Sequence, residues 1–166
     1  MSGYTPEQWT DFFVASAGAS AALAGLVIVA VSVNVARIIE FPNLPPRAAA
    51  TIGSLILILV CAVAGLIPQS AHALGVELLA FGVAGWVFIA WCAWDSFGHS
   101  RRGGRPWHES AIEISLGQLE TIPFVVCGIT LLAGAGGGLY WLAAGFVAVF
   151  VFSLANTWVL LIEILR

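Results

Sequence analysis

The sequence predicts an all-α integral membrane bundle of five transmembrane helices, and three observations lead to this prediction. Hydrophobic residues make up 60% of the 166 residues and charged residues only 9%, whereas soluble domains are about 45–50% apolar and about 25% charged. Five apolar segments each reach the roughly 20 residues that a helix needs to cross a bilayer. The connections between these segments are short, so the sequence leaves no room for a separate soluble domain.

Recognisable breaks separate the predicted spans. The run FPNLPPR follows the first span, PQS follows the second, and AGAGGG follows the fourth. Prolines and clustered glycines interrupt helices, so each run marks a connection. The spans are expected at about residues 12–39, 48–67, 76–97, 110–133 and 139–165, within a single transmembrane domain that covers residues 1–166.

The arginines predict the orientation of the bundle. All six basic residues are arginines, and they fall at the first and third connections and at the last residue. Short cytoplasmic loops retain basic residues, so the N-terminus is expected outside and the C-terminus inside. The first apolar run is longer than a signal-peptide core and no basic residue precedes it, so we expect it to remain as a span. The predicted location is the bacterial inner membrane, with the lipid bilayer as the main partner.

The composition disfavours several classes of function. A net charge of −3 that is scattered along the chain predicts no binding to nucleic acid. The three cysteines lie in apolar runs without a C-x-x-C pair. No zinc signature, serine-nucleophile motif or phosphate-binding loop occurs in the sequence. We therefore expect no enzyme activity, no metal site and no cofactor.

The first predicted span is rich in small residues. Ala17, Ala21 and Gly25 recur at four-residue spacing, as do Gly18 and Ala22. This spacing lets helix backbones approach closely within a membrane. It predicts that other helices of the chain, or copies of the same helix, pack against this face.

A second stripe on the same helix is polar. At about 100° per residue it contains Ser16, Ser20, Leu23, Val27 and Asn34, with Arg37 beside its cytoplasmic end. In one interpretation the helix is the central member of the bundle, and its hydroxyls bond carbonyls one turn back. In the other, copies of the helix surround an axis in a homo-oligomer and the stripe lines a narrow pore.

Three glutamates share one face of the fourth span. Glu109 and Glu113 are expected at the cytoplasmic interface, near the loop arginines and the positive end of the helix dipole. Glu120 lies about 9 Å deeper than Ile114 along the helix axis, just before Thr121 and Pro123. An ionised carboxylate at that depth is costly unless it is protonated, paired or hydrated. We expect Glu120 to be protonated or to pair with Arg37 or a loop arginine.

Two hypotheses follow for this face. In the first, Glu120 forms a cation or proton site, and Glu113 is the carboxylate that a cation reaches before it reaches Glu120. In the second, Glu120 is a structural residue that pairs with an arginine or bonds a neighbouring helix. Asn156, in the fifth span, is expected to hydrogen-bond an adjacent helix, as polar residues in spans commonly do.

Two resemblances accompany these patterns. The run SAALAGLVIVAVSVNV followed by LPPR is similar to the pore helix of the Orai calcium channels. Val33 or Asn34 stands nearest to that family's selectivity glutamate, and the arginines favour the opposite orientation, so this resemblance implies no function. The wider layout FFVASAGASAALAGLVIVAVSVN, LPPRAA, LIPQ and LGVELL resembles a group of small, uncharacterised multispan proteins of actinobacteria, which implies no activity.

Two classes of function remain after these exclusions. The first is a homo-oligomer with a cation or proton pathway along the polar stripe and Glu120. The second is an accessory or scaffold subunit that assembles with other membrane subunits and has no transport activity of its own. The small size and short connections fit both classes.

Overall fold

The computed structural model describes the backbone of residues 3–41, 44–102 and 107–162. It describes their side chains except those of residues 97–102, 107–114, 116 and 159–162. This part of the chain is predominantly helical and contains no strand. Its elements are the 3-10 helix η1 (Pro6–Trp9) and six α-helices: α1 (Thr10–Val33), α2 (Val35–Glu40), α3 (Leu44–Leu66), α4 (Ala71–Arg102), α5 (Trp107–Ala133) and α6 (Leu139–Ile162).

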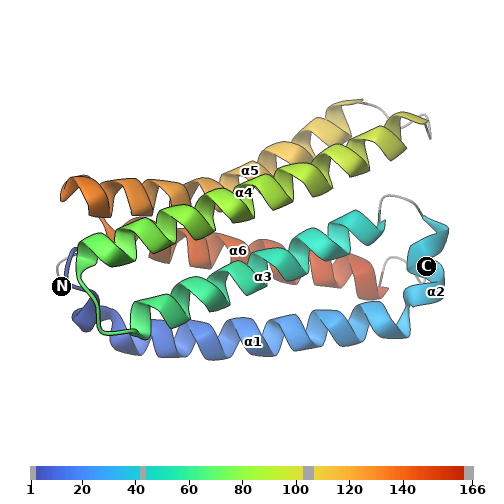
Figure 1. Cartoon of the computed structure of the whole chain (residues 1–166). Coiled ribbons are helices and arrows are strands. Elements are labelled where there is room, and N and C mark those ends of the chain that lie inside the picture. The colour runs from blue at the N-terminus through green and yellow to red at the C-terminus, as the bar shows by residue number, and fades with distance from the viewer. Residues whose placement is uncertain (1–2, 42–43, 103–106, 163–166) are drawn as a thin grey trace.

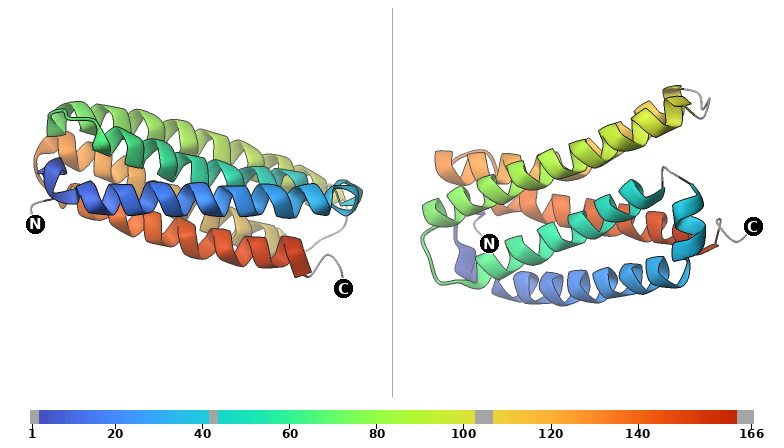
Figure 2. Two further views of the ribbon diagram at one scale, coloured as in Figure 1. Left: turned by 90° about the horizontal axis from the view of Figure 1, so that it is seen from below. Right: turned by 45° about the vertical axis from the view of Figure 1, so that its right-hand side comes forward.

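The long helices form an elongated bundle around α3 (Figure 1). Helix α3 contacts α1, α4 and α6, while α5 packs on α4 and α6. Helices α4 and α5 run side by side and rise away from the other helices toward the end of the bundle where α2 lies (Figure 2). We call this the arginine end, because Arg37 in α2 and Arg47 near the start of α3 lie there.

Four helical segments in the described residues are long and apolar enough to cross a membrane. They are Pro6–Val33, Leu44–Leu66, Ala71–Ser96 and Leu139–Trp158, and α5 adds the shorter apolar stretch Gly117–Ala133. The all-helical bundle that the sequence predicts is therefore confirmed.

Several helix boundaries differ from the prediction. The first helix ends at Val33 rather than continuing to residue 39, because Asn34 leaves the helical conformation and its side-chain amide donates to the Ala30 carbonyl at 3.1 Å. Helix α3 begins at Leu44, before Pro45 and Pro46. Prolines are tolerated in a first turn because the N–H groups there have no helical acceptor. Helix α4 begins at residue 71 and continues to residue 102, beyond the expected 76–97.

Ala17 is half-buried against the apolar core, but the rest of the small-residue face of α1 does not pack within the chain. Gly18, Ala21, Ala22 and Gly25 are all exposed, and a methyl group added at either glycine would meet no other atom within 4 Å. Helix α1 lies at the edge of the bundle (Figure 1). The interpretation of this helix as the central member is therefore wrong.

Close backbone approach occurs instead between α4 and α5. A Cβ atom at Gly128 of α5 would lie 2.7 Å from the backbone of Leu79, and one at Gly82 of α4 would lie 3.1 Å from the backbone of Phe124. Glycines at these positions let the two helix backbones come together, as small residues do in membrane bundles. This contact fixes α5, and with it Glu120, against the rest of the chain.

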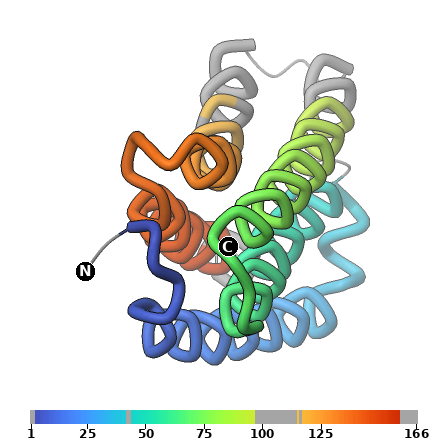
Figure 3. Tube along the Cα trace, turned by 60° about the vertical axis from the view of Figure 1, so that its left-hand side comes forward, coloured from blue at the N-terminus to red at the C-terminus, as the bar shows by residue number. Residues whose placement is uncertain are grey.

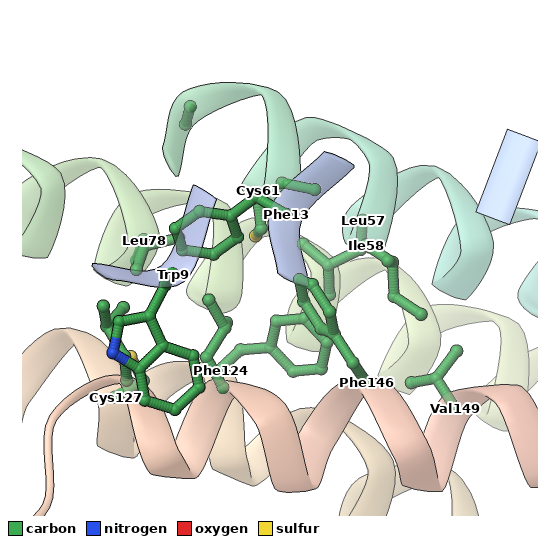
Figure 4. Packing of buried hydrophobic residues seen from close by; sticks show 14 of the residues in the cluster. Trp9, Phe13, Leu57, Ile58, Cys61, Leu78, Phe124, Cys127, Phe146 and Val149 are labelled. Carbon is green, nitrogen blue, oxygen red and sulfur yellow. The ribbon is translucent and has the colours of Figure 1, made fainter. Parts of the chain in front are cut away.

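An apolar core fills the half of the bundle away from the arginine end. Figure 4 shows Phe13, Ile58, Phe124 and Phe146 meeting there from four different helices. These four side chains are fully buried. Cys61, Cys92 and Cys127 are buried free thiols, as their positions in apolar runs predict.

The N-terminal segment closes the end opposite the arginines. The Gly137 N–H donates to the Tyr4 hydroxyl at 2.8 Å, and the Leu139 N–H donates to the Gly3 carbonyl at 2.8 Å. Trp9 is buried and packs edge-on against Tyr140, with ring centroids 5.0 Å apart. Figure 3 shows this segment beside the connection between α5 and α6. We call these contacts the N-terminal clasp.

Candidate functional site

Glu120 is buried at the midpoint of α5. Its side chain is only 7% exposed, and its carboxylate oxygen Oε2 accepts a hydrogen bond of 3.3 Å from the Ser54 hydroxyl of α3. Ser54 is itself only 2% exposed. A carboxyl group so deep in an apolar bundle is costly to keep ionised and is commonly functional.

The Ser54 hydroxyl has two acceptors within reach. Besides Glu120 Oε2, the backbone carbonyl of Ala50 lies 3.1 Å from Ser54 Oγ. A serine hydroxyl carries a single hydrogen, so it cannot donate fully to both acceptors at once. The direction in which the Ser54 hydroxyl points therefore depends on whether the Glu120 oxygen accepts or donates a hydrogen bond.

A line of polar side chains leads from Ser54 to the arginine end. Arg47, Thr51 and Ser54 lie on one face of α3, and Asn156 faces them from α6. Asn156 Oδ1 accepts hydrogen bonds from Arg47 Nε at 3.1 Å and from Arg47 Nη2 at 2.8 Å. The Asn156 amide donates to the Thr51 hydroxyl at 3.2 Å, and that hydroxyl donates to the Arg47 carbonyl at 3.0 Å. We call the five residues Arg47, Thr51, Ser54, Asn156 and Glu120 the polar file.

The polar file spans about a third of α3. From Arg47 to Ser54 is seven residues, or about 10 Å of helix rise. Every buried side-chain nitrogen or oxygen among the described residues has a hydrogen-bond partner. The file therefore consists of two hydrogen-bonded groups: Arg47, Thr51 and Asn156 join α3 to α6, and Ser54 and Glu120 join α3 to α5.

Glu120 has no cationic partner among the described side chains. The one salt bridge in that part of the chain joins Arg37 to Glu40 at 3.5 Å, and both side chains are exposed. Pairing of Glu120 with Arg37, one of the alternatives that the sequence leaves open, is therefore wrong, because Arg37 lies at the surface beside Glu40 of the same helix. The arginines of the third connection lie outside the described side chains.

Glu109 and Glu113 belong to the first turns of α5, but their side chains lie outside those described. The hypothesis that Glu113 precedes Glu120 on a cation's route stays a prediction. Thr121 is fully buried, and its hydroxyl donates within α5 to the carbonyl of Gln118 at 3.2 Å. It therefore offers no hydrogen bond to the carboxylate beside it.

The polar stripe of α1 faces its own bundle. Ser16, Ser20, Val27 and Asn34 are all buried within the chain. The Ser20 hydroxyl donates to the Ala17 carbonyl at 3.0 Å, as one of the two interpretations of this helix expects. A stripe that is covered by the chain's own helices cannot also line an axis between copies. The interpretation in which a ring of first helices forms a pore is therefore wrong.

The polar file stops at Glu120. One helical turn farther along α5, Phe124 is fully buried and lies 5.7 Å from Phe146, centroid to centroid. Phe13 and Ile58 complete the same apolar layer (Figure 4). Among the described residues, this apolar layer therefore separates Glu120 from the end of the bundle opposite the arginines.

The sequence singles out Glu120 and Asn156 but not the other three members of the file. In the sequence, Arg47 indicates only the orientation of the bundle, and Thr51 and Ser54 do not differ from other hydroxyl residues of the spans. The spacing of 47, 51 and 54 on one helical face is the signal that could have found them.

No family model, curated protein or solved structure matches this chain. The chemistry of the polar file is thus the basis for assigning a function. A carboxyl group such as that of Glu120 can exchange a proton or hold a small cation.

Proposed function

We propose that this chain is a five-span protein of the bacterial inner membrane that binds a proton or a small cation at Glu120. The arginine end faces the cytoplasm in this proposal, with the N-terminus outside and the C-terminus inside. The apolar outer surface supports the membrane location, since large side chains such as Val29, Val87 and Val151 are exposed on three different helices. A soluble protein rarely exposes so much contiguous apolar surface.

The observation that carries the proposal is the burial of Glu120 with a single hydroxyl donor. An ionised carboxylate in this position has one hydrogen bond from Ser54 and no described cation to balance its charge. Buried charges are normally paired, and an intramembrane carboxylate without a pair commonly marks a proton or ion pathway. A bound proton or cation supplies the missing compensation.

The polar file gives Glu120 its connection to the arginine end. Protons or cations arrive past Arg47, Thr51 and Asn156, and the Phe124–Phe146 layer blocks the way beyond Glu120. Passage across the whole membrane therefore requires that layer to part. The proposed activity is a gated exchange rather than flow through a permanently open pore.

Self-association belongs to the same proposal. The exposed small residues of α1, Gly18, Ala21, Ala22 and Gly25, offer a face on which a second copy can approach closely. In such a homo-oligomer each copy keeps its own polar file.

An accessory or scaffold subunit without transport activity is the second candidate. It is favoured by the full hydrogen bonding of the buried polar side chains in the described residues, which is what a purely structural network also requires. The two candidates differ in whether Glu120 exchanges its proton or cation with water.

Flux into liposomes tests the proposal. Purified protein is reconstituted with an internal pH-sensitive dye and with valinomycin and potassium to hold the voltage, and an acid step is applied outside. Wild-type protein is expected to admit protons faster than protein-free liposomes do. The Glu120→Gln variant should fall to the protein-free rate, since its amide takes up no proton.

The matched control is Glu77→Gln. Glu77 is a half-buried carboxylate of α4 that accepts a hydrogen bond of 2.8 Å from Gln69, away from the polar file. This variant is expected to keep the wild-type flux. Wild-type protein with no flux of protons, sodium or potassium above protein-free liposomes would contradict the proposal and favour the accessory subunit.

A further inference from the structure

We infer that the species bound at Glu120 is a proton, and that the Ser54 hydroxyl switches its acceptor each time Glu120 gains or loses that proton. This inference rests on the proposed function and narrows the bound species from a proton or cation to a proton. It also assigns a role to Ser54, which is a positioning residue in the sense that it acts through the Glu120 carboxyl group.

The two acceptors of Ser54 define the switch. Ser54 Oγ lies 3.1 Å from the Ala50 carbonyl oxygen and 3.3 Å from Glu120 Oε2. When Glu120 is ionised, the single Ser54 hydrogen points to the carboxylate. When Glu120 Oε2 gains a proton, the new O–H donates to Ser54 Oγ, and the Ser54 hydrogen turns to Ala50.

Neither position of the switch leaves a buried polar group without a partner. In the ionised state the Ala50 carbonyl still accepts the helical N–H of Ser54, because α3 is continuous there. In the protonated state Ser54 Oγ both donates and accepts. The proton balance is simple: one proton enters from the arginine end and joins Oε2, and the same proton leaves when Oε2 is ionised again.

The surroundings suit a proton better than a metal cation. A proton needs one lone pair, whereas hard metal cations take about six oxygen ligands. Membrane transporters commonly supply such oxygens from unwound helix segments. Here α3 at Ser54 is a continuous helix whose carbonyl oxygens accept helical hydrogen bonds. In α5, Pro123 has no N–H and leaves the Leu119 carbonyl oxygen without its helical donor, but one such oxygen is far short of the set that a metal cation needs.

Labelling with dicyclohexylcarbodiimide tests the inference on the reconstituted full chain. This apolar reagent enters bilayers and adds to protonated carboxyl groups. We expect mass spectrometry to find the adduct on Glu120, at a rate that sodium or lithium in excess does not change. A bound metal cation would keep Glu120 ionised, so protection by sodium or lithium would overturn the inference.

Two serine variants test the switch. Ser54→Ala removes the hydroxyl, and we expect the proton flux to fall by roughly five- to tenfold, the rate equivalent of about one net hydrogen bond. Ser54→Thr keeps the hydroxyl and should restore most of the flux. Equal flux in the wild type and Ser54→Ala would overturn the switch, and so would failure of Ser54→Thr to exceed Ser54→Ala.

The outcomes separate this inference from the proposed function. If the flux depends on Glu120 and sodium protects Glu120 from labelling, the proposed function holds and the assignment of the bound species as a proton is wrong. If Glu120 is labelled without protection by sodium or lithium and the protein has no flux, the bound species is a proton and the proposed transport is wrong.

Discussion

Asn156 shows how one side chain can hold two helices together. Its Oδ1 accepts both hydrogen bonds from Arg47, and its amide donates to Thr51. Removing it leaves a guanidinium group without that acceptor and a hydroxyl without that donor. Thr51 is buried, and a buried group that loses a hydrogen-bond partner costs about 1–3 kcal/mol.

The Asn156→Leu variant is therefore expected to lower the free energy of unfolding by about 1–3 kcal/mol. Thermal unfolding of the purified protein in detergent measures this change. The control is Ser32→Ala, which removes an exposed hydroxyl that donates to the Ile28 carbonyl at 2.7 Å within α1. Equal stability of Asn156→Leu and Ser32→Ala would show that the network contributes nothing to the fold.

At the residue scale, the sequence revealed the acid of the site but not its neighbours. Glu120 stands out because a carboxylate in an apolar run is costly, whatever surrounds it. Ser54 does not stand out, since hydroxyls are common in membrane helices and its partner is 66 residues away. Arg47 has a ready explanation as an orientation signal, and only the packing of α3 on α6 shows that it reaches Asn156.

At the scale of the elements, the connection between α5 and α6 depends on glycine. Gly134, Gly136, Gly137 and Gly138 all have positive φ, a region in which other residues are strained. Gly138 has a second constraint, because a Cβ atom there would overlap the carbonyl oxygen of Gly3 in the N-terminal clasp.

Gly134 provides a matched control for that second constraint. Its φ of 65° is close to the 56° of Gly138, but an added Cβ would meet nothing within 4 Å. Both alanine variants should lose roughly 1–2 kcal/mol from the left-handed backbone. Only Gly138→Ala should also release the clasp and speed hydrogen exchange at the Gly137 and Leu139 amides. Equal exchange in the two variants would contradict the clasp.

The small-residue pattern illustrates what spacing alone leaves open. The same periodicity predicted a packed face on α1, but a Cβ atom added at Gly18 or Gly25 would meet nothing within 4 Å. Gly82 and Gly128 instead allow close approach of the α4 and α5 backbones. Spacing identifies a face that allows close approach. Which helix comes to that face depends on the three-dimensional order of the helices, which a single sequence does not contain.

At the scale of the whole molecule, the exposed face of α1 is available for a second copy. A leucine at Gly25 adds bulk where the described chain has nothing within 4 Å. We therefore expect Gly25→Leu to leave the unfolding temperature of a single chain unchanged and to shift the oligomer toward smaller species in mass photometry. An unchanged size distribution would exclude this face as the contact between copies.

In the proposed function of the whole molecule, Glu120 takes up and releases a proton inside the bundle. Infrared difference spectra between acidic and alkaline buffers test it most directly. Wild-type protein is expected to show a carboxylic-acid band that disappears in Glu120→Gln, persists in Glu77→Gln and changes frequency in Ser54→Ala. The opposite result is that Glu120→Gln removes only the absorption of an ionised carboxylate, at every pH at which the protein stays folded. That result would contradict proton uptake by Glu120.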